Sequence, residues 1–304
     1  MPGTPATPGT DRGGGLRAAP ARHPGRWVAT AVVVVLAAMF VNMVVTNRAF
    51  NWSFVAANIV TGPILGGVRL TVLLTVVSMV IGLALGVLLA VMRLSASRLV
   101  RTVAFGYTWF FRSVPRLVLC VLFGNIGILF ARIEFGVPFD RQIGGLLGVP
   151  FDGRFFGFDS TRVITGAVAA ALALGLSEAA YMAEIARAGI LSVDSGQAEA
   201  AQALGMTRPL AFRRVVLPQA LRVIVPPTGN EVIAMLKDTS LVAYVPAYDL
   251  FFQTQAVGTR SFQLFPMLVA ATLWYLALTT VLLVGQYFVE RRFGRGFVSG
   301  GRGV

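Results

Sequence analysis

Six long apolar stretches divide this chain of 304 residues. A transmembrane α-helix needs about 20 mostly apolar residues to cross the hydrocarbon layer of a bilayer, and each stretch is long enough. Hydrophobic residues make up 56% of the chain and charged residues only 13%, which excludes an ordinary soluble domain. The sequence therefore predicts an all-α polytopic membrane protein with six transmembrane helices, over residues 27–46, 61–92, 103–130, 162–185, 221–248 and 262–289.

The arginines between these stretches predict the orientation of the chain. Unbalanced arginines lie in residues 1–26, in the turn at 93–101, in the polar segment at 187–222 and in residues 291–304. Six spans place all four regions on one side, and cytoplasmic loops carry an excess of basic residues. We expect a multi-pass protein of the cytoplasmic membrane with both termini in the cytoplasm. The same placement accounts for the net charge of +13, so we expect no nucleic acid partner.

The two ends of the chain differ in composition from the apolar stretches. Residues 1–26 are rich in Gly, Pro, Ala and Thr and predict a disordered cytoplasmic tail, and residues 291–304 form a second cytoplasmic tail. A cleaved signal peptide is the alternative for the N-terminal region. The apolar stretch at 27–46 is long enough to span and no small-x-small cleavage site follows it, so we expect a retained, peripheral first helix.

The chain is poor in the residue types that catalysis or metal binding requires. His23 and Cys120 are the single residues of their kinds, so we expect no metal site and no disulfide framework. The phosphate-binding pattern G-x-x-x-x-G-K-[ST] is absent, and so are H-E-x-x-H and G-x-S-x-G. We therefore expect a chain that is not an enzyme, binds no cofactor of its own and depends on a partner for energy.

The second apolar stretch carries small residues at every fourth position. Such a ridge lets another helix approach closely, which favours packing where water supplies no driving force. The alternative is that glycines are simply common in membrane helices. The ridge consists of Ser78, Gly82, Gly86 and Ala90.

A long polar segment interrupts the apolar chain between Tyr181 and Leu241. Within residues 194–217, Asp194 and Gln197 form a capping pair for one short helix, which Gly205 ends. Thr207 can cap a second short helix, which Pro218 is expected to close. The expected product is a pair of short helices on the cytoplasmic surface, with Leu204 as a protruding apolar side chain suited to a groove on a partner.

This segment resembles the EAA loop of the membrane subunits of ABC importers, on Glu199, Ala200, Ala201, Gly205, Val215, Leu217 and Pro218. Its flanks are similar to the polar amino acid branch of that family, which takes up histidine, glutamine, glutamate or arginine. The flanking matches are Tyr181, Glu184, Arg187, Gly189, Gly196, Gln197, Gln219, Ala220, Asn230 and 237–241, together with Phe111, Arg112, Ser113, Val114 and Pro115. The resemblance covers residues 64–290 and implies a type 1 transmembrane domain with a five-helix core, to which the first helix is an addition.

The resemblance also implies the partners. It predicts that residues 194–217 dock onto a cytoplasmic ATPase dimer, which binds ATP and Mg²⁺, while a second permease subunit completes the pathway through the lipid bilayer. An extracytoplasmic substrate-binding protein would deliver a polar amino acid, with glutamate preferred. The alternative function is an ion-coupled secondary carrier without an ATPase, which would explain the acidic residues within the spans but not the polar loop.

Polar residues within the apolar stretches are candidates for the translocation path, because buried ionisable groups in a bilayer usually face a pathway or a partner. These candidates are Glu178, Tyr181, Asn230 and Glu231; hydrogen bonding between helices is the alternative. A structural or gating role is expected for Glu184, Arg187, Arg112, Pro115, Lys237 and Asp238. We expect pairs between Glu184 and Arg187 and between Lys237 and Asp238, and a helix break at Pro226 and Pro227.

Two features depart from the family pattern. Arg116 follows Pro115 where an apolar residue is usual, and Leu119 stands near a position that usually holds glutamine. The external stretch at 131–161 is long and rich in phenylalanine. We interpret it as a surface that meets the substrate-binding protein, with a poorly ordered loop as the alternative.

Overall fold

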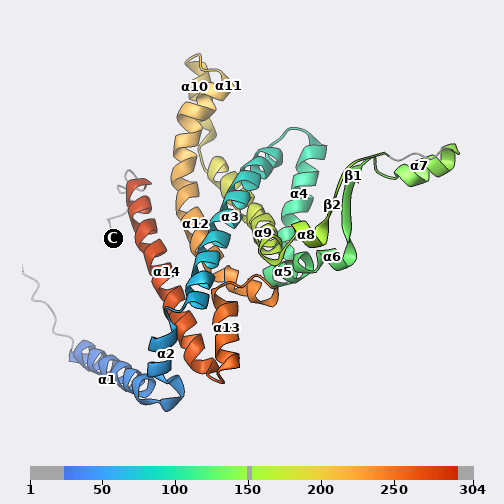
Figure 1. Ribbon diagram of the computed structural model, residues 1–304. Coiled ribbons are helices and arrows are strands. Elements are labelled where there is room, and N and C mark those ends of the chain that lie inside the picture. Colours follow the sequence, from blue (N-terminus) through green and yellow to red (C-terminus); the bar gives the residue numbers. More distant parts are fainter. Residues whose placement is uncertain (1–23, 149–152, 294–304) are drawn as a thin grey trace, which may run out of the picture. The chain divides into compact units, whose positions relative to one another are not determined.

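The computed structural model describes residues 24–148 and 153–293 of the chain (Figure 1). Contacts divide the chain into two units, Met1–Arg48 and Ala49–Val304. The described part of the first unit is helix α1 (Pro24–Thr46), which begins within the predicted tail. The remainder of the two predicted tails, residues 1–23 and 294–304, lies outside the described residues.

The second unit is mostly helical, so the prediction of a helical membrane protein is confirmed. Its elements, with a short turn at its start, are η1 (Arg48–Phe50), α2 (Trp52–Asn58), α3 (Gly62–Arg93), α4 (Arg98–Ser113), α5 (Arg116–Gly124), α6 (Ile126–Leu129), β1 (Arg132–Gly136), α7 (Asp140–Leu147), β2 (Arg154–Asp159), α8 (Ser160–Val163), α9 (Gly166–Leu191), α10 (Ser195–Ala203), α11 (Arg208–Ala211), η2 (Phe212–Val216), α12 (Leu217–Asp238), η3 (Thr239–Tyr244), α13 (Leu250–Arg260) and α14 (Leu264–Phe293).

Among the described residues, four helices are long and apolar enough to span a membrane: α1, α3, α9 and α14. The predicted third span is instead divided between α4 and α5 at Val114 and Pro115. A proline disfavours helical geometry in the residue before it, and Val114 is extended, with ψ of 128°. The division places Arg116 in the first turn of α5.

The expected break at Pro226 and Pro227 is wrong, because α12 runs through both prolines. A proline in a helix has a suitable φ and removes one backbone donor, so the two rings leave the carbonyls of Arg222 and Val223 without their usual partners. Membrane helices tolerate such losses where neighbouring helices surround them, and α12 packs against α9 and α14.

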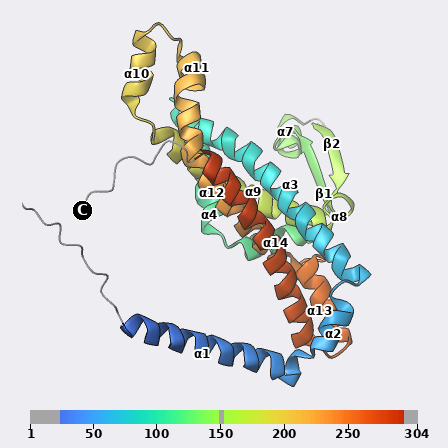
Figure 2. The same ribbon diagram turned by 90° about the vertical axis from the view of Figure 1, so that its left-hand side faces the viewer.

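Helix α9 lies at the centre of the second unit and contacts α3, α4, α5 and α12. Its buried face is built largely of alanine, including Ala169, Ala170 and Ala173, so neighbouring backbones come close. Figures 1 and 2 show α3 packed against α9, and this is the most extensive contact between two helices of the described structure. The largest apolar core gathers beside this contact, with Leu74, Leu119, Leu174, Met235 and Val245 among its members.

The four small residues of α3 are buried and lie where α3 meets α9. The hydroxyl of Ser78 donates to the carbonyl oxygen of Ala171 at 3.4 Å. A Cβ atom added to Gly82 would lie 2.5 Å from Cγ of Glu178, and one added to Gly86 would lie 2.4 Å from Cβ of Met182. Ala90 is only 1% exposed. Glycine at these positions therefore permits the close approach of the two helices.

The polar segment forms a helical hairpin, α10 and α11, which projects from one end of the second unit, opposite α2 and α13 (Figures 1 and 2). Asp194 caps α10 by accepting from the backbone amide of Gly196 at 2.7 Å. Gly205 follows α10 with φ of 82°, in the left-handed region that glycine adopts without strain. The predicted cap at Asp194 and the predicted helix end at Gly205 are therefore confirmed. Thr207 stands at the N-cap position of α11, but its side chain makes no capping hydrogen bond.

Pro218 does not end the second helix of this hairpin, as the sequence had suggested. The helix continues from α11 through the π-helical turn η2 into α12, and Pro218 occupies the first turn of α12. The amide of Leu217 donates to the carbonyl of Phe212, five residues earlier. This wider turn relieves the clash that a proline ring makes with the preceding turn of an ordinary helix.

The predicted external stretch contains an antiparallel hairpin of β1 and β2, joined through α7, with residues 149–152 outside the description. Phe135 stacks on Phe156 and on Phe158, each with ring centroids 6.3 Å apart. At the base, a hydrogen bond from the Thr161 hydroxyl lowers the pKa of Asp159 below its usual value. The hairpin therefore presents an organised aromatic surface.

A buried cap holds the start of α13 and yields a first prediction. Asp249 is fully buried and accepts from the backbone amides of Phe251 and Phe252, at 3.1 and 3.0 Å. Asp249→Ala leaves these amides without a partner and should cost about 2 kcal/mol of folding free energy. Asp249→Asn keeps one oxygen acceptor and should cost less. Thermal unfolding of the two purified variants in detergent checks this; equal melting temperatures would contradict it.

Candidate functional site

Three carboxylates from α9 and α12 surround the side chain of Arg116, which lies on α5. Its Nη1 donates to Oδ2 of Asp238 at 2.5 Å, and its Nη2 donates to Oε2 of Glu178 at 2.9 Å. Oε2 of Glu231 lies 3.7 Å from the same Nη2. One guanidinium is thus shared by three carboxylates, which we call the Arg116 cluster.

An aromatic ring completes the Arg116 cluster. The guanidinium carbon of Arg116 lies 4.7 Å from the ring centroid of Tyr181, and that of Arg112 lies 5.6 Å from it. Both distances suit a cation–π contact. The Arg112 side chain is exposed, whereas Arg116 is held between helices. Tyr181 therefore contacts both a paired arginine and an exposed one.

The depth of burial differs between the carboxylates. The side chain of Glu178 is 0% exposed, whereas those of Glu231 and Asp238 are 25% and 31% exposed. Oε1 of Glu178 is buried and has no hydrogen-bond partner in the described structure. The Arg116 cluster is therefore closed on the α9 side and accessible on the α12 side.

Three of the four predicted path residues, Glu178, Tyr181 and Glu231, come together in the Arg116 cluster. The fourth, Asn230, accepts a hydrogen bond from Nε2 of Gln286 on α14 at 2.9 Å. The expected pair of Lys237 with Asp238 is not found in the described structure: Asp238 pairs with Arg116, and Lys237 is exposed. At the C-terminal end of α12, Asp238 points toward α5. The neighbouring residue Lys237 therefore lies on another side of the helix.

Arg116 is the member that sequence reasoning missed as a site residue, since it stood out only as a departure from the family pattern. A signal was present. A charged residue inside an apolar span is costly unless it is paired, and Glu178 and Glu231 in other spans lacked an assigned cation. Pro115 sets the place of Arg116, because it starts α5 there.

A second ionic group joins the ends of α3 and α9 that lie nearest the α10–α11 hairpin. Glu184 accepts from Nη2 of Arg93 at 3.2 Å and from Nε of Arg187 at 2.9 Å. Arg93 also lies 5.0 Å from the ring centroid of Phe105 on α4. The predicted Glu184–Arg187 pair is present, and Arg93 extends it to a link between three helices.

The residues that resemble the EAA loop are gathered in the hairpin and the start of α12. Ala201 is 4% exposed and lies inside the hairpin, whereas Leu204 is 82% exposed. Glu199 and Ala200 are exposed on α10, and Val215, Leu217 and Pro218 lie in η2 and the first turn of α12. The hairpin therefore has an alanine interior and presents Leu204 and Glu199 outward.

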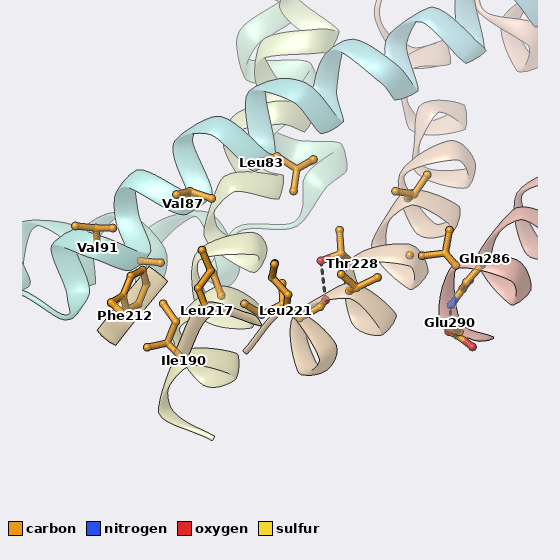
Figure 3. A pocket seen from close by; sticks show the side chains of 17 residues that line it. Leu83, Val87, Val91, Ile190, Phe212, Leu217, Leu221, Thr228, Gln286 and Glu290 are labelled. Carbon is orange, nitrogen blue, oxygen red and sulfur yellow. Dashed lines mark hydrogen bonds between the residues drawn. The ribbon is translucent and has the colours of Figure 1, made fainter. Parts of the chain in front are cut away.

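An apolar groove of about 650 Å³ lies between α3, α9, α12 and α14 (Figure 3). Leu83, Val87 and Val91 line it from α3, and Ile190 and Leu221 lie on the facing helices. Its polar groups are largely engaged: the hydroxyl of Thr228 donates to the carbonyl of Ile224, and Gln286 donates to Glu290. The groove therefore suits apolar material rather than a polar solute.

No group of three or more His, Cys, Asp and Glu side chains able to hold a metal ion occurs within the described residues. Cys120 is buried in the apolar core. The acidic residues of the Arg116 cluster are occupied by a guanidinium, which is not the environment that a divalent cation uses.

The apolar helices, the ionic group within the membrane domain and the projecting polar hairpin define a helical membrane transport subunit. Residues 82–295 match the family of binding-protein-dependent transport system inner membrane components, and the chain belongs to that family. This confirms the resemblance to ABC importer permeases.

Relatives and a solved structure agree with this membership. The chain is 41% identical to the arginine transport system permease protein ArgU of Corynebacterium glutamicum, over 92% of this chain and 84% of the relative. It is 30% identical to a probable glutamine ABC transporter permease of Bacillus subtilis, over 68% of this chain and 82% of the relative. A crystal structure of an amino acid ABC transporter with histidines matches with a TM-score of 0.61 and 30% identity, over 76% of this chain and 94% of that one.

Proposed function

We propose that this permease subunit imports a polar amino acid with a cationic side chain, arginine being the best candidate. The Arg116 cluster carries the proposal: three carboxylates within the membrane domain surround one guanidinium, and two of them are partly accessible. Carboxylates in a poorly hydrated site attract cations and repel anions. The substrate class is thus cationic, in place of the glutamate preferred from sequence alone.

The name of the relative ArgU supports the same substrate class, because that protein covers most of this chain. The aromatic face of Tyr181 adds to the support. A guanidinium donates charge-assisted hydrogen bonds to carboxylates and makes cation–π contacts with aromatic rings, and Arg116 already makes both kinds of contact. A free arginine side chain would find the same partners.

The proposed assembly contains two permease subunits, two cytoplasmic ATPases and an extracytoplasmic binding protein. The α10–α11 hairpin docks on an ATPase, which binds the ATP and Mg²⁺, and the exposed Leu204 is its apolar contact. The β1–β2 hairpin with its exposed phenylalanines meets the binding protein at the other face. The arginine excess at 187–222 supports a cytoplasmic position for the docking hairpin and for both termini.

Transport would follow from coupling between the docking hairpin and the Arg116 cluster. The helix that leaves the hairpin is continuous through η2 and α12 to Asp238, so displacement of the hairpin moves Glu231 and Asp238 with it. The Arg93–Glu184–Arg187 group ties α3 to α9 at the same end. Closure of the ATPases would therefore change the exposure of the carboxylates on α12 relative to Glu178 on α9.

The test is reconstitution of the purified permease in liposomes, with and without its ATPase and binding protein. We expect arginine uptake only when both partners and ATP are present, and little uptake of glutamate. Uptake driven by an ion gradient without the ATPase would favour a secondary carrier instead. Equal uptake of glutamate and arginine would contradict the cationic substrate class.

A further inference from the structure

The guanidinium of Arg116 is the same chemical group that an arginine substrate would bring to the acidic residues of the cluster. Its guanidinium binds Asp238 and Glu178 through separate nitrogens and lies against Tyr181. Charge-assisted hydrogen bonds to carboxylates and contact with an aromatic face are usual means by which proteins bind a guanidinium. Arg116 therefore occupies the place that the proposed substrate requires.

The charges of the cluster leave capacity for a second cation. With all groups ionised, Glu178, Glu231 and Asp238 exceed the charge of Arg116 by two negative charges. The unpartnered Oε1 of Glu178 is an acceptor inside the same group, fully buried. Arg112 lies near the Tyr181 ring and is exposed, and it forms no salt bridge with these carboxylates in the described structure. Lys237 is exposed as well.

The position of Arg116 lets its side chain exchange partners without unfolding a helix. It lies in the first turn of α5, directly after the extended residues Val114 and Pro115. Its side chain is 12% exposed, and the accessible carboxylates, Glu231 and Asp238, lie on the side from which a solute can approach. An entering cation can therefore replace the contacts of Arg116 with these carboxylates one at a time.

We propose that Arg116 is a tethered competitor that holds the acidic site in the absence of substrate and is displaced by the cationic side chain of the substrate. This inference rests on the proposed function, because it concerns the same cationic substrate. The tethered guanidinium lowers the cost of holding three carboxylates in a poorly hydrated site. The competition with Arg116 also means that only a cation able to make the same contacts as this guanidinium can enter the site.

The test uses methylguanidinium as a probe, with the complex of permease and ATPase in nanodiscs. Arg116→Gln removes the competitor, so about 10 mM methylguanidinium should raise the melting temperature of this variant by several degrees, with an apparent affinity roughly tenfold above wild type. Arg98→Gln, on the exposed start of α4, is the matched control and should respond as wild type does. Equal shifts in Arg116→Gln and wild type would overturn the inference.

A second variant protects the test against a failure to fold. Arg116→Lys keeps the positive charge but lacks the planar fork of donors, so methylguanidinium should stabilise it more than wild type. No difference from wild type would overturn the inference. The result is separable from the proposed function, because a failure of wild-type arginine uptake in liposomes would refute the substrate class whatever the probe does.

Discussion

Gly86→Ala should strongly destabilise the packing of α3 on α9. The added Cβ would lie 2.4 Å from Cβ of Met182 and 3.1 Å from the carbonyl oxygen of Ala179, so one methyl group forces α3 away from α9. Overpacking of a tightly packed interior typically costs about 1–3 kcal/mol, and contact with backbone atoms leaves little room to adjust, so we expect about 3 kcal/mol. Thermal unfolding of the purified chain in detergent measures the loss.

Gly66→Ala is the matched control for this substitution. It adds the same methyl group to the same helix, at an exposed position where nothing lies within 4 Å of the new atom. Its melting temperature should equal or exceed that of wild type, since alanine favours a helix over glycine. If both variants unfold at the wild-type temperature, the α3–α9 contact is not as close as described.

Gly205→Val should uncouple arginine uptake from ATP while the chain still inserts into the membrane. Gly205 has φ of 82°, and a β-branched residue in the left-handed region is strained by about 1–2 kcal/mol or more, so the turn between α10 and α11 would change its geometry. Nothing lies within 4 Å of the added Cβ, so the effect is on the backbone alone. We expect uptake by the reconstituted importer to fall roughly tenfold.

Gly205→Asn provides the control, because asparagine tolerates the left-handed conformation at a helix end. It should retain most of the uptake. Glu199→Lys changes the charge of the exposed face of α10 without altering the turn and should also reduce coupling. Normal uptake by both Gly205→Val and Glu199→Lys would refute the docking role of the α10–α11 hairpin.

Much of the architecture could be predicted from sequence because it depends on local patterns. The apolar stretches, the cap at Asp194 and the left-handed Gly205 follow from residues close together in the chain. Helix continuity was harder to predict. Pro226 and Pro227 suggested a break and Pro218 an end, yet α12 passes through the pair and η2 makes room for Pro218. In both places packing and a wider turn outweigh local propensity.

In the candidate site, too, some residues could be predicted from sequence and others could not. Glu178, Tyr181 and Glu231 could be selected from sequence because polar residues are rare in apolar spans. Their common partner could not be selected, because Arg116 is 62 residues from Glu178 and 122 residues from Asp238 in the chain. Asn230, selected by the same criterion, is bound to Gln286 on α14.

The sequence by itself determined that the chain crosses a membrane and where the polar helical hairpin begins and turns, since hydropathy and capping act over short distances. Only the tertiary structure decided that Arg116 lies among three carboxylates and that Gly86 lies against Met182. The physical reason is that ion pairing and close packing depend on which helices are neighbours. That arrangement is set by the combined packing of α3, α5, α9 and α12.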